Sequence, residues 1–150
     1  FDALSDDYYS HLYGEDWKAC KTYFKSLADC VDVAFWQVPP KGFRSEDVAV
    51  KALGMLEAAD AFEPVVMENL GKYDNPTLNL SWDYLSYHLT YCRLYGRFVS
   101  AKASGDEMTA NLYWSQFKDF VCENEDALQR VLDVYYLTHN AEYAKKYRKI

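Results

Sequence analysis

The sequence predicts an all-α fold, in which a single domain forms a bundle of five to six mostly antiparallel helices. Apolar residues recur at alternating spacings of three and four residues through most of the chain, which is the pattern of a helix with one buried face. No segment shows the alternating, Val/Ile/Thr-rich pattern of a strand. The chain has 150 residues, the size of one domain.

The first two helices are predicted near the N-terminus. We expect a short helix from Ser5 to Tyr13, with Ser5 as its N-cap and Gly14 at its end. A second helix is expected from about Asp16 to Val31. Its predicted apolar stripe consists of Trp17, Cys20, Phe24, Leu27 and Val31.

A third helix is predicted to begin at Ser45. The side chain of Ser45 suits an N-cap, and Glu46 and Asp47 would favour the positive end of the helix dipole. We expect this helix to end at Gly71. Its apolar stripe consists of Val48, Ala52, Met55, Ala59, Phe62 and Val66.

The fourth predicted helix, from about 77 to 104, has two apolar faces. One face consists of Leu78, Trp82, Leu85, Leu89, Cys92, Gly96, Val99 and Ala103. The other consists of Leu80, Tyr84, Tyr87, Tyr91, Leu94, Phe98 and Ala101. At about 100° per residue these faces lie on nearly opposite sides. We therefore expect this helix at the centre of the bundle, with Gly96 permitting a close approach of another backbone.

Gly105 predicts a tight turn into a fifth helix, which would run antiparallel to the fourth. Either Ser104 or Asp106 is expected to cap it. The apolar stripe expected on the fifth helix consists of Ala110, Tyr113, Phe117 and Phe120, with Trp114 and Val121 beside it. After a break near Glu123, a last helical stretch is expected to turn Leu128, Val131, Leu132 and Tyr135 inward.

The composition argues against several classes of protein. The net charge is −7, whereas a protein that binds duplex nucleic acid needs clustered cations. No run approaches the roughly 18 apolar residues of a membrane-spanning helix. The four cysteines lie in apolar helical patterns without Cys-x-x-Cys spacing, so we interpret them as buried thiols. Localisation is not indicated, because the chain opens at Phe1 without a methionine and is expected to be a fragment or a processed product.

No set of residues predicts catalysis, a metal or a cofactor. The Glu-x-x-His pairs of a carboxylate-bridged metal site in a bundle are missing. His88 and Cys92 lie four residues apart and could meet on one helix, but no third group is evident to orient them. We interpret His88 as a packing histidine. The carboxylates Glu57, Asp60, Glu63 and Glu68 are interpreted as a solvated face.

The best candidate for an interaction surface is the segment around two prolines, Pro39 and Pro40. It carries Phe35 and Trp36, with Phe43 close behind. Large aromatic rings on a proline-stiffened segment can stack on a sugar face or insert into a neighbouring domain. They can equally fold back over the bundle, and the sequence leaves these alternatives open.

The predicted hairpin resembles a known group of proteins. The residues that carry the likeness are Ala101-Lys102-Ala103, Gly105-Asp106, Ala110, Trp114, Glu123, Glu125, Leu128 and Asp133-Val134, with Tyr8-Tyr9, Tyr13-Gly14, Trp17 and Tyr23-Phe24 in the N-terminal part. They resemble the C-terminal helical region, a family of unknown function, of bacterial glycoside-hydrolase-like proteins with α-glucuronidase-type barrels. The resemblance implies that the catalytic carboxylates lie in an upstream barrel, and no catalytic residue is carried over to this chain.

The sequence therefore favours a non-catalytic accessory module of a carbohydrate-active protein. Its expected partner is the upstream catalytic domain of the same chain, and homo-oligomerisation and contact with carbohydrate are further expectations. The alternative is a partner-binding module that resembles a tetratricopeptide unit through Gly105, Ala110 and Trp114. The other positions of that motif and its 34-residue period are not found.

Overall fold

The structure is a computed structural model that describes residues 2–31 and 44–139, and these are helical almost throughout. The helices are α1 (Asp2–Tyr13), α2 (Trp17–Cys30), α4 (Glu46–Asn69), α5 (Pro76–Ser104), α6 (Glu107–Glu123) and the short α7 (Glu125–Leu128), with a 3-10 turn, η1 (Gly14–Asp16), between α1 and α2. Residues 134–139 are also helical. The described residues contain no strand, so the predicted all-α bundle is confirmed.

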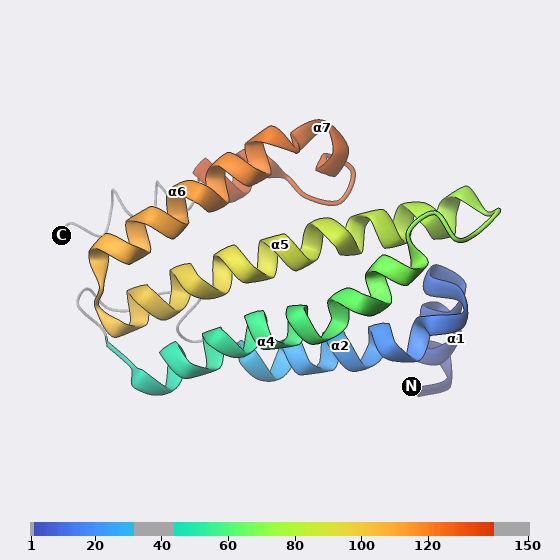
Figure 1. The fold of residues 1–150 in the computed structure, drawn as a ribbon, viewed down its shortest axis with the longest axis horizontal. Coiled ribbons are helices and arrows are strands. Elements are labelled where there is room, and N and C mark those ends of the chain that lie inside the picture. The colour runs from blue at the N-terminus through green and yellow to red at the C-terminus, as the bar shows by residue number, and fades with distance from the viewer. Residues whose placement is uncertain (1, 32–43, 140–150) are drawn as a thin grey trace.

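The long helix α5 lies between two layers, as the two apolar faces predicted. Figure 1 shows α4 along one side of α5 and α6 along the other, with α2 beside α4 and α1 across one end. Neighbouring helices along the chain from α2 to α6 run in opposite directions. The prediction of a central helix at about 77–104 is confirmed, and the helix includes one further residue, Pro76, at its start.

The two faces of α5 are buried to different degrees. The face toward α4 is fully buried at Trp82, Leu85, Leu89, Cys92, Gly96, Val99 and Ala103. The face toward α6 is made of half-buried rings, including Tyr87, Tyr91 and Phe98. These rings lie 6.5 Å from Phe120, 4.9 Å from Phe117 and 5.0 Å from Trp114, respectively, measured between ring centroids.

The close approach predicted at Gly96 is present. A methyl carbon built on Gly96 would lie 2.7 Å from the backbone oxygen of Ala52 and 2.7 Å from Cδ1 of Leu56. The glycine therefore lets α5 approach the backbone of α4 more closely than a larger residue would allow. This contact fixes the relative positions of α4 and α5.

The predicted helix caps are largely found. Ser45 accepts a hydrogen bond from the Val48 amide at 3.2 Å, as predicted. Asn75, which was not predicted as a cap, accepts one from Thr77 at the start of α5. Gly105 has a φ of 79°, in the left-handed region, which costs glycine little. Of the two caps considered for α6, Asp106 is the one used, since its carboxylate accepts from the Thr109 amide at 3.1 Å. Gly105 and Asp106 together define the turn between α5 and α6.

Two predictions about the N-terminal helices are wrong. Helix α1 begins at Asp2, so Ser5 lies inside it and is not the N-cap. In α2 the buried stripe is Cys20, Tyr23 and Leu27, whereas Phe24 is half-buried and Val31 is 38% exposed. Because 20-23-27 and 20-24-27 are both helical spacings, the sequence pattern alone did not fix which ring faces the core.

The inward residues predicted after the break are also partly wrong. Leu128 is buried as expected, but Val131 and Tyr135 are 58% and 70% exposed. The buried residue is Val134, which packs with Trp114 and Phe117 of α6. Helix α7 ends at Leu128, and a non-helical stretch separates it from residues 134–139. The helical spacing counted from Leu128 therefore does not continue across this stretch, and it does not predict which of the later residues face inward.

Candidate functional site

The interaction surface predicted at Phe35, Trp36 and Phe43 lies outside the described residues. It stays a prediction. The candidate sites that the structure describes are a buried polar contact between α2 and α5, an ion-pair cluster on α4 and α5, and apolar side chains on the outer faces of the helices.

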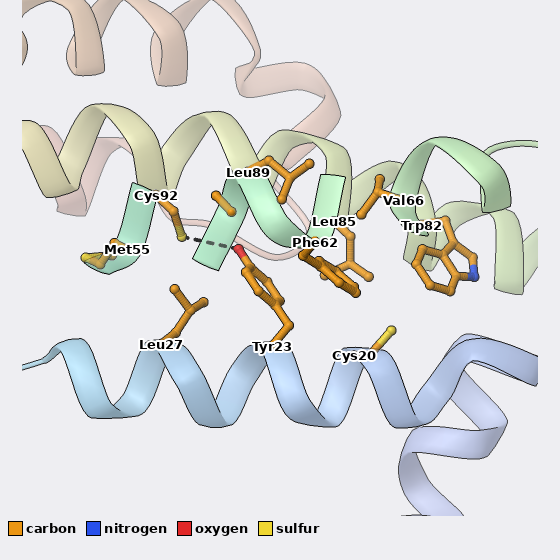
Figure 2. Packing of buried hydrophobic residues seen from close by; sticks show 11 residues of the cluster. Cys20, Tyr23, Leu27, Met55, Phe62, Val66, Trp82, Leu85, Leu89 and Cys92 are labelled. Carbon is orange, nitrogen blue, oxygen red and sulfur yellow. Dashed lines mark hydrogen bonds between the residues drawn. The ribbon is translucent and has the colours of Figure 1, made fainter. Parts of the chain in front are cut away.

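The buried polar contact joins Tyr23, His88 and Cys92, which we call the Tyr–His–Cys cluster. The Tyr23 hydroxyl lies 3.1 Å from Nδ1 of His88 and donates to Sγ of Cys92 at 3.5 Å. Figure 2 shows Tyr23 of α2 reaching across to Cys92 of α5. The Cys92 sulfur lies 3.7 Å from Nε2 of His88. The predicted meeting of His88 and Cys92 therefore occurs, and Tyr23 is a third member that the sequence analysis missed.

Aromatic rings enclose this cluster. The ring of Tyr23 stacks on Phe62 of α4 with centroids 4.3 Å apart and planes 12° apart. His88 lies 5.8 Å from Phe24 of α2 and stacks on Tyr91 at 5.9 Å and 18°. A ring pair of this kind contributes about 0.5–1.5 kcal/mol beyond the area it buries. The surroundings are apolar, which sets the protonation states of the polar groups.

Burial favours the neutral form of each titratable group in the cluster. It lowers the pKa of His88 and raises the pKa of the Cys92 thiol to about 11. It also raises the pKa of the Tyr23 hydroxyl. A cysteine acts as a nucleophile or a metal ligand through its thiolate, so a thiol with a pKa this high is poorly suited to either role. The packing role predicted for His88 agrees with this geometry.

A second polar cluster ties η1 to the end of α4. Asn69 is fully buried, and its amide nitrogen donates to Asp16 at 2.8 Å and to the Val65 carbonyl at 2.9 Å. Its amide oxygen accepts from the Tyr73 hydroxyl at 2.9 Å and from Lys72 at 3.2 Å. Each polar group of Asn69 has a partner, so the cluster connects three segments without leaving its buried amide unsatisfied.

The ion-pair cluster lies at the edge between α4 and α5. Arg93 donates to Glu63 through both terminal nitrogens, at 3.3 and 3.0 Å, and its Nε donates to Asp60 at 2.7 Å. Two of the four carboxylates interpreted as a solvated face therefore also pair with a cation of the neighbouring helix. Because the Asp60 side chain is 66% exposed, these pairs are expected to contribute little to stability.

Neither a metal site nor a membrane span is found in the part of the chain that the structure describes. Residues 2–31 and 44–139 hold no group of three or more His, Cys, Asp or Glu side chains arranged to bind a metal ion. Within the same residues, no helix combines the length and the apolar composition needed to cross a membrane.

Several large apolar side chains are exposed in pairs at helical spacing. On α6, Met108 is 82% exposed and Leu112 is 53% exposed. On α1, Leu4 and Tyr8 are 72% and 62% exposed. Residues four apart lie on the same face of a helix, so each pair forms a small apolar patch. We call Met108 and Leu112 the α6 patch.

Comparison of the chain with family models, with curated proteins and with solved structures found no match. The likeness to the helical region of glycoside-hydrolase-like proteins therefore depends on the sequence motifs alone.

Two of the buried polar residues could have been found from the sequence. Tyr23 lies three residues after Cys20 and four before Leu27, which is as good a helical spacing as that of Phe24. Asn69 lies three residues after Val66 and so continues the apolar stripe of α4. A polar residue at a stripe position is a signal for a buried hydrogen-bonded group.

Proposed function

We propose that this chain is a non-catalytic helical accessory module of a multidomain, glycoside-hydrolase-like protein. In this proposal it packs on the catalytic domain or aids oligomerisation. The carbohydrate-active parent is supported by the sequence resemblance around Gly105-Asp106, Ala110 and Trp114. The accessory role is supported by the positions of the reactive and the apolar side chains.

The observation that carries the accessory role is the contrast between buried reactive groups and exposed apolar ones. His88 and Cys92, the pair closest to a catalytic arrangement in the described residues, are enclosed between α2 and α5 in their neutral forms. The α6 patch, in contrast, faces outward. The α6 patch therefore offers apolar side chains to a partner, which favours packing over chemistry at this surface.

The α6 patch suits a contact with another domain because α6 is an outer layer of the bundle. One side of α6 packs on α5 through Trp114 and Phe117. Met108 and Leu112 are exposed on α6 instead of packing there. Burying a side chain of this size contributes roughly 1.5–3 kcal/mol. Two such residues can add to an interdomain contact without forming one by themselves.

The alternative function is a partner-binding module of the helical-repeat type. The arrangement of α4, α5 and α6 as successive antiparallel layers favours it, since helical repeats stack in this way. The dimensions differ from a tetratricopeptide unit, because a unit of about 34 residues holds two helices while α5 alone has 29 residues.

Removing residues 1–150 from the parent protein tests the accessory role. We expect the shortened protein to melt at a lower temperature or to lose its oligomeric state, as measured by calorimetry and light scattering. The double variant Met108→Asp/Leu112→Asp should reproduce part of this loss in the full protein. The control is Leu4→Asp, at another exposed apolar position, on α1. An unchanged melting temperature, oligomeric state and activity after the deletion would rule out the accessory role.

A further inference from the structure

We propose that the contact between His88 and Tyr23 is a pH-sensitive latch, which holds α2 against α5 while the imidazole is neutral and loosens when it is protonated. The latch is independent of the proposed function, since it concerns the internal contact between two helices.

The position of His88 makes it the group on which this contact depends. Its ring lies between the two apolar faces of α5, and its Nδ1 is 3.1 Å from the Tyr23 hydroxyl of α2. Phe24, the next residue of α2, packs on the same ring at 5.8 Å. Two adjacent α2 side chains therefore contact one imidazole, and a change in its charge is felt directly at the α2–α5 contact.

The groups that face the imidazole leave it without a carboxylate partner among the contacts the structure describes. From α2 these are Tyr23 and Phe24, and from α5 itself they are Tyr91 and Cys92. On the α6 side, the uncharged Phe117 packs on Tyr91. The tyrosines and the thiol are neutral at physiological pH, because burial raises the pKa of each.

The ion-pair cluster of α4 and α5 sets one cation, Arg93, against two carboxylates, and none of the three has a described contact with the imidazole. Arg93 follows Cys92 on α5, but its guanidinium is bound by Asp60 and Glu63 of α4. Both carboxylates bind Arg93, and the pKa of His88 is lowered by burial with no contribution from either of them. A protonated His88 would thus be a charge in an apolar contact, which is costly unless the charge is paired.

The direction of the pH effect follows from the two states of the contact. A histidine in water has a pKa of about 6.5, and burial lowers the pKa of His88 in the closed contact. The imidazole of His88 therefore binds a proton more readily when it is released into water than when it is buried against Tyr23. The contact has its full strength above about pH 6.5 and is weakened as the pH falls through that value toward the lowered pKa.

Hydrogen exchange on the whole chain tests the latch. After correction for intrinsic exchange rates, the protection of α2 amides should fall between pH 7.5 and pH 5, while that of α6 amides should fall less. The loss can reach tenfold for each unit by which burial lowers the pKa. In His88→Gln, which keeps a hydrogen-bonding group but cannot titrate in this range, the loss in α2 should disappear. His11→Gln, at an exposed position on α1, should keep it.

Two results of the exchange experiment would overturn the latch. Protection of α2 that does not change with pH, or a loss of the same size in His88→Gln, would show that His88 is not the latch. If His88→Gln fails to fold, an NMR titration of the wild-type ring decides the matter. A His88 pKa below about 6.5 supports the latch, and one at or above 6.5 overturns it.

Discussion

The two faces of α5 solve the same packing problem in different ways. The face toward α4 is built from residues that are almost completely buried, such as Trp82 and Leu89, and it includes a glycine where the two backbones meet. The face toward α6 is built from half-buried tyrosine and phenylalanine rings. Packing of the face toward α4 depends on a close fit between the helices. Packing of the face toward α6 depends on the area that its large rings bury.

This difference follows from the number of helices that cover each face. The inner face is covered by α4, with α2 and α1 packing into the same core. The outer face is covered by α6 and residues near Val134. Where fewer helices are available, large rings with a polar tip can fill the space and still reach water. Tyr91 and Tyr95 pack in this way on the face toward α6.

The largest expected effect comes from removing a ring on the inner face. Trp82 is fully buried and lies 5.8 Å from the ring of Tyr13 and 6.3 Å from that of Phe62. Trp82→Ala should lower the free energy of unfolding by about 3–5 kcal/mol, measured by urea denaturation. The matched variant on the face toward α6 is Tyr87→Ala. Removal of this half-buried ring should lower the free energy of unfolding by clearly less. Equal losses at the two positions would contradict the proposed difference between the faces.

A smaller effect is expected from filling the space at Gly96. The added methyl group of Gly96→Ala would lie 2.7 Å from the backbone oxygen of Ala52, so α4 and α5 would have to separate. Overpacking of this kind costs about 1–3 kcal/mol, although alanine is the better helix former. The control is Ser86→Ala on the same helix, which should change the unfolding free energy by less than about 0.5 kcal/mol. A stabilised Gly96→Ala would show that the inner face is not closely fitted.

The helical architecture could be predicted because its signals are local and redundant. Ser45, Gly105 and the two stripes of α5 each predict the observed boundaries or faces. Six apolar positions of α4 recur without interruption, and all are buried. Each of these signals depends on residues close in sequence, so knowledge of the tertiary structure was not needed to interpret them.

The candidate site could be predicted only in part, because it depends on contacts between distant residues. The approach of His88 and Cys92 was predictable from their spacing on one helix. The third member, Tyr23, lies 65 residues away from His88, and α2 offers either Tyr23 or Phe24 to the core at equally good spacing. The choice between them depends on where α4 and α5 lie, and Phe62 provides the stacking partner for Tyr23.

The smallest effect is expected at the edge of the inner face, where Arg93 pairs with Asp60 and Glu63. Arg93→Met keeps much of the apolar stem and removes the charge, so it should cost only about 0.2–1 kcal/mol at low salt. A double-mutant cycle with Glu63→Gln, measured by urea denaturation, isolates the energy of the pair. That energy should decline toward zero at about 1 M salt, where the screening length is about 3 Å. A coupling that stays above about 1 kcal/mol at high salt would mean that the ion pair, and not only the apolar fit, holds α4 against α5.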